Sequence, residues 1–487
     1  SNGTAVLGLG NIGPEAGKPV MEGKGVLFKI FADIDVFDIE INETDPEKFV
    51  QIVKALEPTF GGINLEDIKA PECFDIEQKL KEQLKIPVMH DDQHGTAIIS
   101  AAALLNAVEI QKKKIDKVKI VVNGAGAAAM ACMKLYIALG AKHKNFMVFD
   151  RKGIIYKGRP DIDELKKDFC VDAKYKDYDL AAAFKDADVF VGLSVGNVVT
   201  AKMIKSMAKN PIVFAMANPD PEIPYEEAIA AREDLIMATG RSDYPNQVNN
   251  VLGFPYIFRG ALDVRATTIN EEMKLAAVKA LASLTREPVP DIVNLAYNEK
   301  TISFGPNYII PKPLDPRLLS TVSPAVAKAA MESGVAKYPI KDWEAYELEL
   351  NKRLGLDNQL SRVIGNKARK DPKRVLFADA ENIKILKVAQ LVVEEGVGYP
   401  VLMGNMVRIK KLAAENGIDL EDMPIIDPKD DINEDLRKKY GELFYEKRHR
   451  HGVNKHEAYK LMRDRNYFGC MLVETGEVDC MISGLTR

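Results

Sequence analysis

The sequence contains only five cysteines and one tryptophan among its 487 residues. The cysteines are scattered, odd in number and never spaced as CxxC, so neither a disulfide framework nor a zinc knuckle is indicated. A reducing location, the cytoplasm, is therefore expected. The five residues are Cys73, Cys132, Cys170, Cys470 and Cys480.

Long apolar runs and an excess of positive charge are also missing. Runs such as 97–108 fall short of the roughly 20 apolar residues that cross a bilayer. A net charge of −4 offers no basic surface to phosphates, so we expect neither a membrane span nor a nucleic-acid partner. Neither an initiator methionine nor a signal segment opens the chain. We therefore expect it to be cut at its start, and Gly484-Leu485-Thr486-Arg487 is an equally abrupt end.

The length and composition are those of a globular protein with several domains. At about 100 to 200 residues per domain, the chain predicts about three folding units. Its 46% hydrophobic and 28% charged residues are close to the averages for globular proteins.

Residues 97–237 alternate helical patterns with short β-rich runs, which predicts a doubly wound parallel sheet covered by helices. The expected strands are 119–122, 146–149, 189–191, 212–215 and 235–237. Helices are expected at 128–139, 200–208 and 225–231. The sequence therefore predicts an α/β fold with a Rossmann-like domain.

Two further α/β units are expected beside this domain. Residues 1–92 would form a small unit, followed by the Rossmann-like domain at 93–350. The Pro-rich stretch 305–316 interrupts regular structure, and a helix at 324–332 follows. A boundary is expected near 350–360. A third unit at 358–487 would begin with strands at 374–377 and 400–403 and helices at 383–395 and 407–416.

Two stretches match a dinucleotide-binding fingerprint. Gly8-Leu9-Gly10-Asn11-Ile12-Gly13 has Pro14 and Glu15 where the helix should begin, and we interpret it as a packed turn. Gly124-Ala125-Gly126-Ala127-Ala128-Ala129 follows a strand pattern and precedes an Ala-rich helix, whose N–H groups would point at a pyrophosphate. The predicted cofactor contacts are Gly124, Ala125, Gly126, Ala127 and Ala128.

The residues after the next strand give conflicting signals about the nucleotide. Asp150 could bind a ribose hydroxyl, whereas Arg151 and Lys152 could neutralise the 2′-phosphate of NADP. A solvated turn is an equally good interpretation of Arg151 and Lys152. The choice between NAD and NADP stays open.

His90-Asp91-Asp92-Gln93-His94-Gly95-Thr96 has histidines four residues apart, as in the HExxH helix of zinc hydrolases. Against that function, Pro87 and Gly95 bracket the segment, Asp replaces the general-base Glu, and no third ligand is evident. The alternative interpretation of both histidines is as hydrogen-bonded loop residues.

Oxygen ligands suggest a better metal site. Glu66, Asp67 and Asp92 could hold a hard cation such as Mg²⁺ or Mn²⁺, although Glu66 and Asp67 can share an ion only at a strand end or turn. Lys24, followed by the apolar run 26–31, could have a lowered pKa and act as a base. On local sequence alone, exposed acidic residues and a solvent-facing lysine are the favoured interpretations.

Four segments, taken together and in this order, resemble malic enzymes. They are the run from Ser1 to Gly10, the pair Glu66-Asp67, HDDQHGTA from His90 and GRSDYPNQVNN from Gly240. The resemblance spans residues 1 to about 350. The region from about residue 360 onward is similar to the front part of a phosphotransacetylase domain, the arrangement of bacterial hybrid malic enzymes.

The resemblance implies an NADP-dependent (or NAD-dependent) enzyme that converts malate to pyruvate and carbon dioxide with Mg²⁺ or Mn²⁺. It implies that Lys24 is the catalytic base and that Glu66, Asp67 and Asp92 bind the metal. Asn218 would hold the cofactor together with the 124–129 turn, beside Asp150 and Arg151. Asn250 would contact substrate or nicotinamide. The resemblance thus implies that Lys24, Asn218 and Asn250 would all contact the substrate.

Two departures from the family pattern concern the acid and the substrate carboxylate. The family's acid is a tyrosine that would lie upstream of Ser1, so impaired activity of this chain is one expectation. Ala5 stands where many malic enzymes carry an arginine, which resembles the hybrid subfamily.

The resemblance also bears on the third unit and on partners. This unit ends before most phosphotransacetylase catalytic residues, so we expect no acetyl transfer but a regulatory domain that binds acetyl-CoA. The basic run Lys447-Arg448-His449-Arg450-His451 could touch such a ligand or form a solvated helix face. A homo-oligomer is expected.

Two rival functions stay open beside malate oxidation and the less favoured zinc hydrolase. One is a dehydrogenase of another 2-hydroxy acid. The other is a ligand-binding or regulatory chain without activity.

Overall fold

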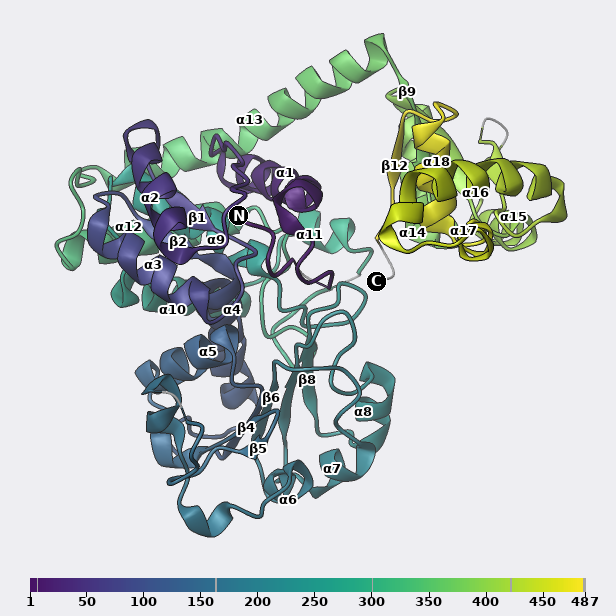
Figure 1. Cartoon of the computed structure of the whole chain (residues 1–487). Helices are drawn as coiled ribbons and strands as arrows, with labels where there is room; N and C mark the ends of the chain where they lie inside the picture. Colours follow the sequence, from purple (N-terminus) through teal and green to yellow (C-terminus); the bar gives the residue numbers. More distant parts are fainter. Residues whose placement is uncertain (7, 163, 300, 421–422, 485–487) are drawn as a thin grey trace. The chain divides into compact units, whose positions relative to one another are not determined.

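The computed structural model describes residues 1–487 except 7, 163, 300, 421–422 and 485–487. The chain divides into two compact units, Ser1–Gly355 and Leu356–Arg487, coloured from purple to yellow along the sequence in Figure 1. Each unit is described by itself. Among the described residues, no helix has both the length and the hydropathy to cross a bilayer.

The first unit begins with a small two-stranded sheet and three helices. The strands β1 (Ile63–Leu65) and β2 (Val88–His90) pair in parallel. Three helices, α1 (Gly13–Ala32), α2 (Pro46–Leu56) and α3 (Glu72–Gln83), accompany them. The apolar run 26–31 lies in α1, where the ring of Phe28 packs 4.7 Å from that of Phe254. The N-terminal residues therefore pack on the same core as the following helices.

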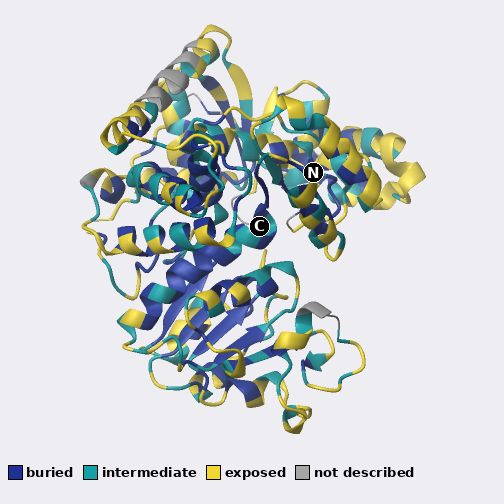
Figure 2. Ribbon diagram, turned by 90° about the vertical axis from the view of Figure 1, so that its left-hand side faces the viewer, coloured by how far each residue is buried: buried dark blue, intermediate teal, exposed yellow. Residues whose placement is uncertain are grey.

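A six-stranded sheet with the order β5-β4-β3-β6-β7-β8 follows. It is parallel except for β5, which runs antiparallel to β4. All five predicted strands are confirmed to within two residues, and so is the doubly wound fold. The strands of this sheet consist mostly of buried residues, which are dark blue in Figure 2. They are β3 (Ile120–Asn123), β4 (Phe146–Asp150), β5 (Gly153–Ile154), β6 (Val189–Gly192), β7 (Ile212–Ala215) and β8 (Ile236–Thr239).

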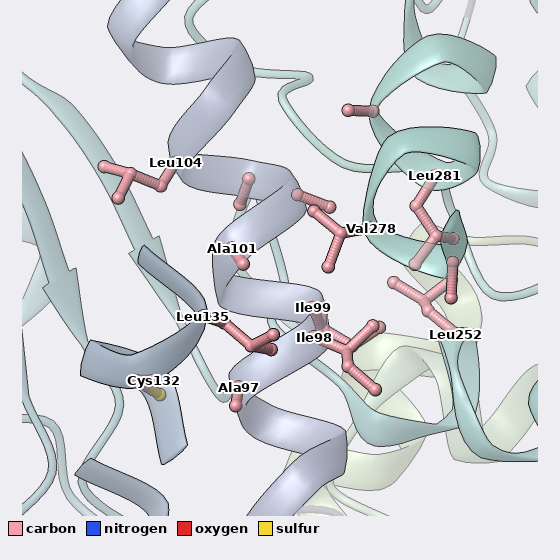
Figure 3. Close-up of a cluster of buried hydrophobic side chains, with 14 of the residues drawn as sticks. Ala97, Ile98, Ile99, Ala101, Leu104, Cys132, Leu135, Leu252, Val278 and Leu281 are labelled. Carbon is pink, nitrogen blue, oxygen red and sulfur yellow. The ribbon is translucent and has the colours of Figure 1, made fainter. Parts of the chain in front are cut away.

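Helix α4 (Asp91–Ile110) is buried on nearly all sides because it lies between α5 (Ala127–Ala138) and α10 (Glu271–Arg286). Figure 3 shows its small side chains Ala97 and Ala101 among larger ones from α5 and α10. The other helices of this unit are α6 (Leu180–Phe184), α7 (Ala201–Ser206), α8 (Tyr225–Ala231), α9 (Phe254–Asp263), α11 (Asp291–Ala296) and α12 (Arg317–Glu332).

Two helices differ from the sequence prediction. The helix expected at 324–332 begins at Arg317, with Pro324 inside it. Burial of α12 against α9 and α10 compensates for the hydrogen bond that proline cannot donate. A long helix, α13 (Trp343–Lys370), runs through the predicted boundary at 350–360, so the division between the two units falls inside a helix.

The second unit is a four-stranded parallel sheet with the order β11-β10-β9-β12. The four elements predicted here are confirmed to within two residues. The strands are β9 (Lys373–Phe377), β10 (Gly398–Met403), β11 (Ile425–Ile426) and β12 (Cys480–Ile482). The helices are α14 (Ile383–Glu394), α15 (Met406–Glu415), α16 (Glu434–Arg448), α17 (Lys455–Leu461) and α18 (Arg465–Glu474).

Short 3-10 helices connect several of these elements. They are η1 (Glu57–Thr59), η2 (His143–Asn145), η3 (Glu164–Phe169), η4 (Ala173–Tyr175), η5 (Asn250–Leu252), η6 (Asp431–Asn433) and η7 (His449–His451).

Candidate functional site

Four carboxylates gather where β1 ends and α4 begins. Glu66 and Asp67 directly follow β1, and Asp91 and Asp92 open α4 directly after β2. Because β1 and β2 are parallel neighbours, both pairs leave the same edge of the small sheet. The backbone N–H of Asp67 donates to Oδ2 of Asp92 at 2.8 Å. The three acidic residues predicted from the sequence therefore lie together.

Glu66 and Asp67 meet the geometric condition that the sequence imposed. They lie past the end of β1, and Asp67 has a left-handed backbone with φ of 55°. The pair is therefore free of the alternation that would send neighbouring strand side chains to opposite faces.

Lys24 points from α1 into this carboxylate cluster. Its Nζ lies 3.0 Å from Oε1 of Glu66 and 2.5 Å from Oδ2 of Asp91. It also lies 3.8 Å from the centre of the Phe254 ring. The lysine therefore has both the apolar surface that the sequence suggested and two carboxylate partners.

The charges around Lys24 contradict the lowered pKa expected from the sequence. Burial alone would lower the pKa of Lys24, but the attraction of Asp91 and Glu66 raises it above its ordinary value. The local sequence could not reveal this effect, because both carboxylates come from other elements.

The carboxyl groups of Asp67, Asp91 and Asp92 resist ionisation. Burial and the charge of Glu66 raise the pKa of Asp67 to about 6, and burial raises that of Asp91 to about 6 despite the opposing charge of Lys24. Burial and neighbouring carboxylates also raise the pKa of Asp92. Four acidic groups around one ammonium thus make a site that favours an additional cation.

The donor set fits a hard divalent ion in chemistry. All its donors are carboxylate oxygens, and the buried Oδ2 of Asp67 accepts no hydrogen bond from the described residues. Within the described ranges, no three acidic, histidine or cysteine side chains converge closely enough to enclose an ion as they stand. The side chains of Glu66, Asp67 and Asp92 would have to move to do so.

Asn250 joins the cluster from η5. Its Nδ2 donates to Oδ2 of Asp91 at 3.3 Å, and its Oδ1 accepts from the Thr96 hydroxyl at 3.1 Å. Gly95 lies between them: a Cβ there would be 2.2 Å from Oδ1 of Asp91 and 2.9 Å from Cγ of Asn250. Gly95 was expected to bracket the segment, but it lies inside α4, at a point where the site leaves no room for a side chain.

The two histidines of this segment do not form a zinc site. His90 ends β2 and is buried, with no hydrogen-bond partner for its ring among the described residues. His94 lies in the first turn of α4 and uses both ring nitrogens, one toward Glu77 and one toward Lys274. The expectation of a loop was wrong, but the spacing still does not aim both rings at one ion.

The turn between β3 and α5 has the geometry of a phosphate-binding loop. Gly124 has φ of 114°, and a Cβ there would lie 2.4 Å from the carbonyl oxygen of Leu193. Gly126 precedes the first residue of α5, Ala127, and a Cβ on it would meet nothing within 4 Å. The turn is thus open to a ligand at Gly126, which is exposed.

The earlier glycine-rich stretch is a hydrogen-bonded turn, as predicted, but residues 8–11 are exposed and not packed. The N–H of Gly10 donates to the carbonyl of Val6 at 2.8 Å, and that of Gly13 to the carbonyl of Gly3 at 3.0 Å. Helix α1 begins at Gly13, with Pro14 in its first turn. Backbone N–H groups in the first turn have no partner within the helix, so the missing N–H of proline costs nothing there.

At the end of β4, Asp150 is engaged by Arg159, a residue that the sequence did not single out. The Arg159 guanidinium binds Asp150, lies 2.7 Å from Asp161, and is almost fully buried. Oδ1 of Asp150 accepts the backbone N–H of Lys152 at 2.9 Å. Asp150 is therefore already neutralised by Arg159 and hydrogen-bonded by Lys152. Arg151, the next residue, is exposed.

Asn218 follows β7 at the carboxyl edge of the sheet and is exposed. The loop that carries it is held by Glu222, whose two carboxylate oxygens accept the N–H groups of Ser194 and Ala217 at 3.1 Å. Glu222 is fully buried, and a Cβ on Gly192 would overlap its carboxylate. Burial raises the pKa of Glu222 to about 7 although these hydrogen bonds lower it.

Sequence reasoning missed Asp91, Arg159 and Glu222. The signal for Asp91 was present, because two consecutive aspartates at the start of a helix can both reach one site. Arg159 contacts a residue nine positions away and Glu222 contacts residues five and 28 positions away, all through folded loops, so no spacing pattern indicated them.

The two groups of site residues belong to one packed unit. Ala127, the first residue of α5, packs against the apolar cluster that contains Leu65 and Ile68, which flank Glu66 and Asp67. A cavity of about 190 Å³, lined mainly by apolar side chains, also includes Lys24 and Glu66 in its wall.

Three family models match the chain. Residues 1–47 and 42–81 match the malic enzyme N-terminal domain, and residues 93–295 match the malic enzyme NAD binding domain. Residues 359–487 match the phosphate acetyl/butaryl transferase family.

Individual proteins agree with these models. The NADP-dependent malic enzyme of Salmonella typhimurium is 53% identical over 99% of this chain, and the chain spans 64% of that protein's length. The NADP-dependent malic enzyme of Halomonas elongata is 59% identical over 70% of this chain and 80% of its own length. The crystal structure of malic enzyme from Pyrococcus horikoshii matches with a TM-score of 0.67 and 42% identity, over 75% of this chain and 83% of that one.

The range matched by the first malic enzyme model includes Lys24, Glu66 and Asp67, and the range matched by the second includes the turn between β3 and α5. The chain belongs to the malic enzyme family.

Proposed function

We propose that this chain oxidises malate and releases carbon dioxide to give pyruvate, with NADP⁺ as the hydride acceptor and a divalent metal ion. The observation that carries the proposal is the position of Lys24 between Asp91 and Glu66, beside Asp67 and Asp92. The phosphate-binding turn in the same unit supports it.

Glu66, Asp67 and Asp92 would hold the metal ion. Their excess negative charge and oxygen donors suit Mg²⁺ or Mn²⁺. When bound, such an ion supplies a Lewis acid that polarises the C2 oxygen of malate and stabilises the enolate left by decarboxylation.

Lys24 would take the proton of the C2 hydroxyl as the hydride leaves. Nζ is held by Asp91 and Glu66, so its position is fixed. While both carboxylates are charged, Lys24 keeps its own proton, and it can act as a base only when the charge of Glu66 is offset. Sharing Glu66 between metal and lysine would therefore make the base depend on a loaded metal site.

Asn250 and Asn218 would orient the reacting groups. The Asn250 amide is held by Thr96 and Asp91, which leaves its second Nδ2 hydrogen for a substrate carboxylate. Asn218, exposed at the carboxyl edge of the sheet, would contact the nicotinamide.

The surroundings of Asp150 favour NADP over NAD. A free carboxylate at the end of β4 would bind the ribose 2′-hydroxyl and repel a 2′-phosphate. Here Arg159 neutralises Asp150, and Arg151 is exposed beside it. NADP⁺, bound on residues 124–128, would accept the hydride from C2.

Initial rates with three substrates test the proposal. Malate, lactate and tartrate are each supplied with Mn²⁺ and with NADP⁺ or NAD⁺, and Asp92→Asn serves as the matched variant. We expect NADPH and pyruvate from malate only, and a large loss in Asp92→Asn. Faster turnover of lactate or tartrate would favour another 2-hydroxy-acid dehydrogenase, and binding without turnover would favour a regulatory chain.

We further propose that the second unit binds acetyl-CoA as an effector, that the chain self-associates, and that it works in the cytoplasm. The family match over residues 359–487 supports the first point, and the five free cysteines suit a reducing compartment. The basic run from Lys447 to His451 is exposed at the end of α16. Calorimetry with acetyl-CoA and light scattering would test the effector and the self-association.

A further inference from the structure

A buried chain of polar side chains joins three helices behind the first turn of α4. It consists of Glu77 on α3, His94 on α4 and Lys274 on α10. Glu77 and Lys274 are only 6% and 2% exposed. None of the three has a role in the function proposed above.

The hydrogen bonds in this chain run in one direction. Nζ of Lys274 lies 3.2 Å from Nδ1 of His94, and Nε2 of His94 lies 3.0 Å from both oxygens of Glu77. An ammonium group only donates, so Nδ1 is the acceptor and Nε2 carries the proton that is donated to Glu77. Lys274 thereby fixes the tautomer of His94.

Glu77 forms hydrogen bonds to two residues at the start of α4. Besides the His94 ring, its Oε1 accepts the backbone N–H of His90 at 3.0 Å. His90 precedes α4 and makes no side-chain cap for it. Asp91 and Asp92 lie between His90 and His94 in the sequence, so the hydrogen bonds from Glu77 hold the chain on both sides of the two aspartates.

The outer ends of the chain are also held. Lys274 donates to Oε1 of Glu271 at 2.7 Å, and Lys81 lies 2.7 Å from Oε1 of Glu77. Buried charges of this kind cost desolvation energy that an apolar trio of similar volume would not. The network is better explained by the orientation it imposes than by the stability it adds.

We propose that Glu77, His94 and Lys274 are positioning residues that hold Asp91 and Asp92 in place for the metal ion and Lys24. This inference rests on the proposed function, because it assigns the network to the metal and base site. It predicts that breaking the hydrogen bonds weakens metal binding even when the protein stays folded.

The test measures Mn²⁺ binding to the full chain by electron paramagnetic resonance, with circular dichroism as the check on folding. His94→Leu removes both hydrogen bonds and should weaken Mn²⁺ binding by about tenfold or more. His94→Gln retains one acceptor and one donor in place of the ring nitrogens and should stay within about threefold of the wild type. If His94 served only in packing, Mn²⁺ binding would not be weaker in His94→Leu than in His94→Gln.

Two comparisons keep the inference apart from the proposed function. If wild type does not bind Mn²⁺, or Asp92→Asn binds it equally well, the metal site itself is wrong. If wild type binds and Asp92→Asn does not, but folded His94→Leu binds as wild type does, the positioning role is overturned. Equal losses in His94→Gln and His94→Leu would overturn it too.

A second variant covers the case in which His94→Leu does not fold. Lys274→Met, on a separate helix, removes the group that donates to Nδ1 of His94. The other tautomer of His94 then becomes accessible. We expect about tenfold weaker Mn²⁺ binding, and unchanged binding in the folded variant would contradict the proposal.

Discussion

At Lys24 two opposing effects set the charge of one amine. Burial disfavours the ammonium form, whereas Asp91 and Glu66 favour it more strongly. Because one of these carboxylates is also a proposed metal ligand, the protonation of the lysine and the loading of the metal site are physically linked.

Lys24→Ala should abolish turnover while both ligands still bind. Loss of a positioned base costs about 10²- to 10⁴-fold in rate, and the variant should keep its NADP⁺ and Mn²⁺ affinities within a few-fold. Lys29→Ala is the matched control, since Lys29 lies on the same helix but pairs with Asp33 and Asp35. Stopped-flow measurement of NADPH formation decides, and hydride transfer at the wild-type rate in Lys24→Ala would remove it as the base.

Glu222 provides a prediction of pH dependence. Its pKa is about 7 in the folded protein because of burial, above an ordinary value near 4.5. Because folding raises the pKa of Glu222, the folded protein favours the protonated carboxyl group, which adds to the free energy of unfolding at low pH. This stabilisation is lost as the pH rises toward and through 7.

The stability advantage of wild type over Glu222→Gln should therefore fall between pH 5 and pH 8, by about 2 kcal/mol. Urea denaturation of both proteins at the two pH values measures it. The amide's poorer fit to the Ser194 and Ala217 N–H groups adds an offset that does not vary with pH. A difference that stays constant would show that folding leaves the pKa of Glu222 unchanged, and one that grows would show that folding lowers it.

Among the elements, the β3–α5 turn separates the needs of folding from those of binding. At Gly124 the positive φ and the Leu193 carbonyl exclude any side chain, whereas Gly126 has an ordinary φ of −86° and open space beside it. The first glycine serves the fold, and the second leaves room for a ligand.

Gly124→Ala should destabilise the protein by about 2 to 4 kcal/mol, because the added methyl meets backbone and the residue is forced to positive φ. Gly126→Ala should keep its melting temperature but bind NADP⁺ at least about tenfold more weakly, since the methyl projects where phosphate would approach. Thermal unfolding and fluorescence titration distinguish the two. Unaltered NADP⁺ affinity in Gly126→Ala would mean that the nucleotide binds elsewhere.

The elements that were predictable from sequence are those whose signal is local. The strands and helices that the sequence predicted around the two sheets follow apolar periodicity, and apart from α12 they were located to within two residues. Other elements, such as β11, β12 and α16, were not predicted. The positions of Gly95 inside α4 and Pro324 inside α12 were misjudged, because close approach or tertiary packing overrides the local preference at each. The division after Gly355 lies within the predicted 350–360, but the helix α13 that contains it was not predicted.

The same limit applies to the site. Glu66, Asp67, Asp92 and Lys24 could be named through motifs, and the structure brings them together. The pKa of Lys24 and the support from Glu77 depend on contacts between different elements, and the pairing of Asp150 with Arg159 depends on how the intervening loop folds. No sequence pattern records such contacts.

For the whole molecule, the division into two units separates the proposed chemistry from the C-terminal region. Every residue proposed for metal, substrate or nucleotide lies in Ser1–Gly355, which has its own core. The second unit has separate apolar clusters on its sheet.

A chain of residues 1–355 should therefore fold and keep NADP⁺ and Mn²⁺ binding, with malate turnover within about threefold of the full chain because no contact of the proposed site is removed. Circular dichroism, titration and initial rates check this. Acetyl-CoA should affect the full chain but not the shortened one. A shortened chain that is folded and binds neither ligand would show that the second unit contributes to the site.

The central claim is that one site couples metal-assisted decarboxylation to hydride transfer. The most direct test is the product ratio from malate with Mn²⁺ and NADP⁺, with NADPH, pyruvate and carbon dioxide all quantified in the same reaction. The account predicts equal amounts of the three, all lost together in Lys24→Ala and Asp92→Asn. NADPH without pyruvate, or products undiminished in both variants, would contradict it.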